Sequence, residues 1–138
     1  MTAGGRPVRV LPGDERVVVL LDGQFLAGLR LAVAARERGL GHTLVRVDCG
    51  GPEERAGLLT DPGASAGLVR GALEAAGGVL GRRVGPARAV AGQSFGGLAV
   101  GRLLAERPDL LRAGIVQSGS FWHGRAAPGP GGPDAAGG

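Results

Sequence analysis

Apolar residues fall into short blocks that switch between two periodicities along the chain. Val17–Leu21 is an unbroken run of valine and leucine, typical of a strand buried on both faces, as in parallel sheets. Phe25–Arg38 places apolar residues at helical spacing and stops at Gly39, which predicts a helix. The same patterns predict strands at Val8–Leu11, Leu44–Val47, Ala87–Ala91 and Ala113–Gln117, and helices at Ala64–Leu80 and Gly96–Arg107.

Two segments lack either pattern. Cys49–Pro62 contains consecutive glycines and a proline, and we predict a loop there. From Gly124 onward the chain is Gly, Pro and Ala with two charged residues, so it has nothing to bury and we predict disorder. The sequence therefore predicts one domain over residues 1–123 and a disordered tail over residues 124–138.

The alternation of strands and helices predicts the fold class. It favours an α/β fold, a three-layer αβα sandwich with a mostly parallel sheet. In such sheets the chemistry lies beyond the carboxyl ends of the strands. Four segments are expected at that edge: Asp22-Gly23-Gln24, Asp48-Cys49, Gly92–Gly96 and Ser118–His123.

Composition excludes several function classes. The 138 residues carry a net charge of +4, and the basic residues, all arginine, are dispersed with few aromatics, so we expect no nucleic-acid partner. No apolar run of about 18 residues or more occurs, so no membrane span is expected. The first residues lack the apolar stretch of a secretory signal, which predicts a cytoplasmic protein. A single cysteine, Cys49, excludes an intrachain disulfide and a multi-cysteine zinc site, and we expect no cofactor.

The most informative motif is Gly92-Gln93-Ser94-Phe95-Gly96, which fits Gly-x-Ser-x-Gly between a predicted strand and a predicted helix. A tight turn there would expose the Ser94 hydroxyl above the sheet, with the Phe95 N–H as half of an oxyanion hole. The alternative is a glycine-rich turn with an incidental serine. A backbone N–H of Gly23 or Gln24 could supply the second donor, although the same residues could form an ordinary turn.

Three blocks resemble the enterochelin (enterobactin) esterase family of esterase-D-like α/β hydrolases. They are Val18–Gln24, Val90–Leu98 and Val116–Trp122. The resemblance implies a partial α/β-hydrolase core and a serine esterase that hydrolyses ferric catecholate siderophores in the cytoplasm and releases iron. It implies that Ser94 is the nucleophile, that Phe95 supplies an oxyanion N–H, that the Ser118–Trp122 loop lines the pocket, and that Arg55 matches an arginine of the family.

The chain also departs from that family. Family members are longer, with an amino-terminal β domain and later strands that hold the acid and the histidine, so the resemblance implies a truncated chain. After Ser94 the only histidine is His123, which matches no family histidine but could act as a base. The acidic residues after Ser94 complete no convincing triad, and the residue after Arg55 is not the family's glutamate. His42 precedes its strand and is expected at the opposite edge.

Several alternatives therefore remain open. The chain could be a serine esterase for a siderophore, an esterase for another acyl ester, or an inactive fragment or binding module. Trp122 could pack on a catecholate ring or only within its loop. Cys49 could react, but a small apolar filler is the commoner role. The open edge of the Ala113–Gln117 strand predicts self-association.

Overall fold

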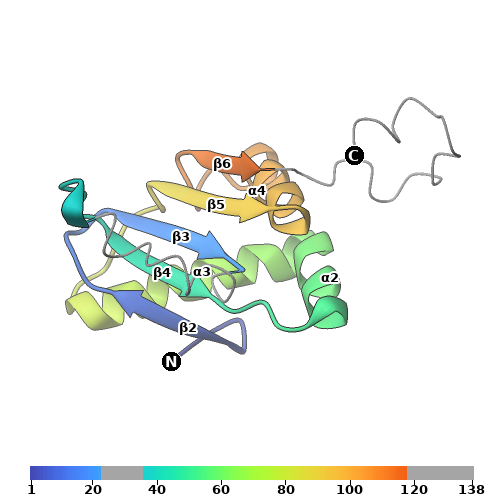
Figure 1. Cartoon of the computed structure of the whole chain (residues 1–138), viewed down its shortest axis with the longest axis horizontal. Helices are drawn as coiled ribbons and strands as arrows, with labels where there is room; N and C mark the ends of the chain where they lie inside the picture. Colours follow the sequence, from blue (N-terminus) through green and yellow to red (C-terminus); the bar gives the residue numbers. More distant parts are fainter. Residues whose placement is uncertain (23–35, 118–138) are drawn as a thin grey trace, which may run out of the picture.

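The computed structural model describes residues 1–22 and 36–117 (Figure 1). Within them a six-stranded sheet has the order β1-β2-β4-β3-β5-β6. The strands are β1 (Thr2–Ala3), β2 (Arg6–Leu11), β3 (Val17–Leu21), β4 (Thr43–Val47), β5 (Ala89–Gln93) and β6 (Gly114–Gln117). The four strands from β4 to β6 are parallel, whereas β2 runs antiparallel to β4 and β1 antiparallel to β2.

Strand β3 lies at the centre of the parallel part because its residues are apolar throughout. It pairs with β4 on one side, Val19 opposite Val45, and with β5 on the other, Val19 opposite Val90. All three of these valines are fully buried. The continuous apolar run therefore predicted the bounds of this strand and its burial.

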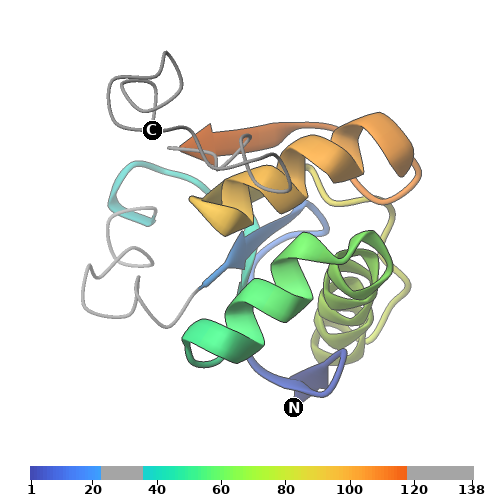
Figure 2. The same ribbon diagram turned by 90° about the vertical axis from the view of Figure 1, so that its right-hand side faces the viewer.

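Three helices cover one face of the sheet (Figure 2). They are α2 (Pro52–Thr60), α3 (Pro62–Leu80) and α4 (Phe95–Glu106). Helix α3 packs against β1 to β4 and α4 against β5 and β6, while α2 touches both helices. Asp61 caps the amino end of α3, where its carboxylate accepts a 3.0 Å hydrogen bond from the Gly63 N–H. Gly81 caps the other end in the left-handed conformation.

The prediction of an α/β fold with a mostly parallel sheet is confirmed. Most of the helix predicted at Phe25–Arg38 lies outside the described residues, and so does the tail predicted over residues 124–138. In the described part of the chain, no helix is long and apolar enough to cross a membrane.

The prediction of a loop over Cys49–Pro62 is wrong, because α2 occupies most of it. The helix follows Gly51 with proline at its first position, where the missing N–H costs no hydrogen bond. Glu53 and Glu54 lie in the first turn, where the helix dipole stabilises acidic side chains. Only Leu59 is fully buried, so the segment shows little apolar periodicity.

Candidate active site

Ser94 forms a strained turn between β5 and α4. Its φ of 57° and ψ of −118° lie in a region that side chains other than glycine rarely adopt. Two hydrogen bonds hold this backbone: the Ser94 N–H donates to the Gln117 carbonyl at 3.0 Å, and the Leu98 N–H donates to the Ser94 carbonyl at 3.1 Å. The turn is thus fixed by the neighbouring strand and by its own helix, and it has the form of a nucleophile elbow.

Glycine at position 92 is a steric requirement of this turn. A Cβ atom there would overlap the carbonyl group of Gly96, where the helix folds back over the strand. Gly96 is different, since a Cβ atom at that position would meet Asp22 Oδ2 at 3.5 Å and Leu21 Cβ at 3.8 Å, which are ordinary contacts. Of the two flanking glycines, only Gly92 is required for steric reasons.

Arg55 of α2 reaches across the carboxyl edge of the sheet to the turn. Its Nε donates to Asp22 Oδ2 at 2.7 Å and its Nη2 donates to the Gln93 carbonyl at 3.0 Å. Its guanidinium carbon also lies 5.6 Å from the centre of the Phe95 ring, within cation–π range. Arg55 therefore contacts the residue on each side of Ser94.

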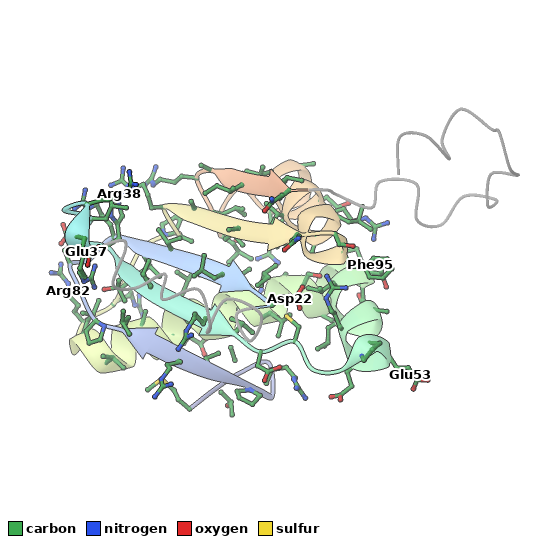
Figure 3. All side chains as sticks on the ribbon, viewed as in Figure 1. Asp22, Glu37, Arg38, Glu53, Arg82 and Phe95 are labelled. Carbon is green, nitrogen blue, oxygen red and sulfur yellow. The ribbon has the colours of Figure 1, made fainter. Side chains whose placement is uncertain are left out.

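Asp22 directly follows β3 and is nearly inaccessible, with 4% of its surface exposed. Figure 3 shows it at the same end of the sheet as Phe95, whereas Glu37, Arg38 and Arg82 lie at the other end. Like Ser94 it has a positive φ, 58°, and these two are the only such residues besides glycine in the described chain. Its Oδ1 atom is buried and has no hydrogen-bond partner within residues 1–22 and 36–117.

A cavity of about 690 Å³ opens at this edge. It is lined by Asp22, Gly50, Gly51, Pro52, Arg55, Gln93 and Ser94. Ser94 itself is half-buried. The cavity therefore combines a strained serine with a guanidinium group at the amino end of a helix, a region that favours developing negative charge.

Cys49 lies at the same edge but is shielded from solvent. It is fully buried, and burial raises the pKa of its thiol to about 12, with the neighbouring Asp22 carboxylate acting in the same direction. A thiol in this state is neutral and unreactive near pH 7. The structure favours the packing role for Cys49.

The structure brings together three of the predicted site residues: Ser94, Phe95 and Arg55. Asp22 was predicted only as part of a turn, and its contact with Arg55 adds it to the site. The other predicted site residues, Gly23, Gln24, Trp122 and His123, lie outside the described residues.

The described residues contain one histidine and no cluster suited to a metal. His42 directly precedes β4 and so lies at the amino edge of the sheet, opposite the edge that holds Ser94. Within residues 1–22 and 36–117, no group of three or more His, Cys, Asp or Glu side chains could hold a metal ion.

Comparison with known proteins gives matches at the level of structure. A scan of protein-family models finds no match, and a search of curated proteins finds none either. The enterochelin esterase of Shigella flexneri superposes with a TM-score of 0.74 at 25% identity, over 92% of this chain. The ferric enterobactin esterase of Salmonella typhimurium superposes with a TM-score of 0.60 at 27% identity, over 86% of this chain.

The chain is structurally similar to enterobactin esterases. It spans 35% of the length of the Shigella flexneri enterochelin esterase and 34% of the Salmonella typhimurium ferric enterobactin esterase. Two further structures of the Shigella flexneri enterobactin esterase were obtained in the presence of 2,3-dihydroxy-N-benzoyl-glycine and 2,3-dihydroxy-N-benzoyl-serine. The resemblance expected from the three sequence blocks is confirmed, and the fold is that of an esterase-like α/β hydrolase.

Proposed function

We propose that the protein is a serine esterase in which Ser94 attacks the carbonyl carbon of an ester. The observation that carries this proposal is the strained backbone of Ser94 between β5 and α4, at the wall of the cavity. Backbone strain of this kind persists where the surrounding structure holds it, and nucleophiles of α/β hydrolases use it. The similarity to enterobactin esterases supports the same assignment.

The chemistry would proceed by acyl transfer. The Ser94 Oγ atom forms a bond to the carbonyl carbon, its proton passes to a base, and the ester alcohol leaves with a proton. The negative oxygen of the tetrahedral intermediate would accept from the Phe95 N–H and from a backbone N–H of Gly23 or Gln24. His123 is the candidate base, and water then releases the acid from Ser94.

For the substrate we propose an ester of a 2,3-dihydroxybenzoyl compound, with a ferric catecholate siderophore as the physiological form. The support is chemical: the structural relatives were crystallised with 2,3-dihydroxybenzoyl amino acids. Trp122 would offer an aromatic face to the catechol ring. We propose that the reaction takes place in the cytoplasm and releases iron there.

The test is covalent labelling by a fluorophosphonate together with hydrolysis of a p-nitrophenyl ester. We expect the wild-type protein to be labelled at Ser94 and to turn over the ester. The S94A variant should lose both activities. The T2A variant is the control because it removes the hydroxyl of an exposed residue in β1, away from the cavity. Labelling that persists in S94A would contradict the proposal.

A second candidate function is ligand binding without catalysis. It is favoured by one observation, that the histidine of the described residues lies at the edge opposite Ser94. In that case 2,3-dihydroxybenzoyl-serine would bind, as measured by calorimetry, while neither labelling nor turnover would depend on Ser94.

A further inference from the structure

The carboxylate of Asp22 is costly to bury at this position. A charged side chain removed from water destabilises the fold unless partners compensate for its lost hydration. In the described chain Asp22 Oδ2 accepts a 2.7 Å hydrogen bond from Arg55, the carboxylate lies beside the Cys49 thiol, and its buried Oδ1 has no hydrogen-bond partner there. Because apolar residues of similar volume often stabilise a fold as well as a buried ion pair does, stability alone is weak ground for this pair.

The position of the pair suggests another role. Asp22 holds the Nε side of the guanidinium, which leaves the Nη2 side to donate to the carbonyl of Gln93, the residue before Ser94. The central carbon of the same guanidinium lies over the ring of Phe95, the residue after Ser94, 5.6 Å from the ring centre. A planar guanidinium can make these contacts at once only in one orientation, and Asp22 fixes that orientation.

Asp22 also lies close to the start of α4. A Cβ atom added at Gly96 would stand 3.5 Å from Asp22 Oδ2. The carboxylate therefore lies close to the first turn of the helix, a region whose dipole favours negative charge. Asp22 and Ser94, the two positive-φ residues other than glycine in the described chain, follow adjacent strands, and Arg55 links Asp22 to the two neighbours of Ser94.

We infer that Asp22 is a positioning residue, which acts through Arg55 to hold the Gln93–Phe95 turn in the strained form that presents Ser94. Its consequence for catalysis rests on the proposed esterase function, but its effect on the turn does not. The inference therefore predicts a change in backbone protection at the turn as well as a change in reaction rate.

Amide hydrogen exchange followed by NMR tests the effect on the turn without any reaction. The Ser94 and Leu98 amides report on the turn, since their hydrogen bonds hold its backbone, and the Val90 amide, which donates to Ala113, reports on the same pair of strands away from it. In D22N we expect exchange at Ser94 and Leu98 to rise about tenfold or more, with Val90 unchanged. R55A should do the same, and the double variant should add little. D14N is the control, because Asp14 pairs with Arg16 at 2.6 Å at the other edge of the sheet.

Chemical rescue tests the same relationship in the reaction. D22N should slow fluorophosphonate labelling of Ser94 by about tenfold or more, as expected when a reacting group is misplaced. Guanidinium chloride below denaturing concentrations should restore labelling to R55A, with sodium chloride as the ionic-strength control. It should restore none to R55A/D22N, because the free cation then lacks the carboxylate that orients it.

The possible outcomes separate the two proposals. The positioning role would be overturned if the Ser94 and Leu98 amides of D22N exchange at the wild-type rate. It would also be overturned if exchange at Val90 rises by the same factor. Rescue that is independent of Asp22 would overturn it as well. If the wild-type protein is never labelled but D22N selectively loosens Ser94 and Leu98, the esterase proposal fails and the positioning role stands.

Discussion

The carbonyl group of Gly96 occupies the space that a side chain on Gly92 would need. The two residues lie at the end of β5 and in the first turn of α4. The obstructing atoms belong to the backbone of Gly96, so they cannot rotate away from an added side chain. We therefore expect G92A to lower the free energy of unfolding by about 1–3 kcal/mol or more, as overpacking of a rigid site does. Urea denaturation followed by circular dichroism measures this loss.

The matched control is G96A. A methyl group at that position meets only ordinary contacts, and alanine is favoured over glycine within a helix by about 0.5–1 kcal/mol. G96A should therefore unfold at the same urea concentration as the wild type or at a higher one. Equal destabilisation by both substitutions would show that the close approach at Gly92 is not the cause.

A second close approach ties helix α3 to the first strand. A Cβ atom at Gly71 would lie 2.7 Å from the Ala3 Cα atom and 2.9 Å from the Gly4 nitrogen. We expect G71A to displace β1 and to cost about 1–3 kcal/mol. G67A, in the same helix with open space around it, should instead gain about 0.5–1 kcal/mol. Thermal unfolding of the two variants gives the comparison, and a stable G71A would contradict the packing of β1 on α3.

The buried thiol of Cys49 gives a prediction about pH. Burial raises its pKa from 9.0 to about 12, so folding favours the protonated form. The stabilisation is complete below pH 9, where the unfolded thiol is also protonated, and is lost as the pH rises toward 12. The stability of the wild type should therefore fall more steeply above pH 9 than that of C49A, in urea titrations at each pH.

The same thiol should resist alkylation in the folded protein. At pH 8 we expect reaction with iodoacetamide to be at least about 100-fold slower without urea than in denaturing urea, because the thiolate is nearly absent and the sulfur is inaccessible. Rapid modification of the native protein, measured by mass spectrometry, would show that this edge opens.

The outer strand β6 predicts self-association. Among the described residues it pairs only with β5, and Ile115 is 57% exposed on it. Exposed apolar strands at a sheet edge favour pairing with another copy. We expect sedimentation velocity to show association that grows with concentration and that I115K weakens. L40K is the matched control, since Leu40 is 49% exposed away from this strand. A wild type that remains monomeric at all concentrations would contradict the prediction.

Sequence patterns predicted most of the strands, and they predicted β3 best because it alone is apolar without interruption. Val17–Leu21 was predicted at the bounds that the structure has, since turn residues close it on both sides. Strand β1 has two residues, too few to show any periodicity. Helix α2 was missed because its burial rests mainly on Leu59, although Pro52 followed by two glutamates is a recognisable start signal.

The residues of the candidate site also differ in whether the sequence could predict their roles. Ser94 was found because its motif is local, a turn whose residues are consecutive. The role of Asp22 could not be predicted, because it depends on a contact with a residue 33 positions later and on a helix that the pattern did not reveal. The sequence shows only that an aspartate directly follows an apolar run, and its burial became known from the structure.

The positive φ values at Asp22 and Ser94 mean that the backbone carries its least favourable conformations at one edge of the sheet, next to the cavity. A strand end closed by glycine at either position would relax this energy, of order 1–3 kcal/mol for each residue. Selection for stability alone would remove both side chains. Their presence marks this edge as the part of the described chain that retains backbone strain at a cost in stability, as functional sites do.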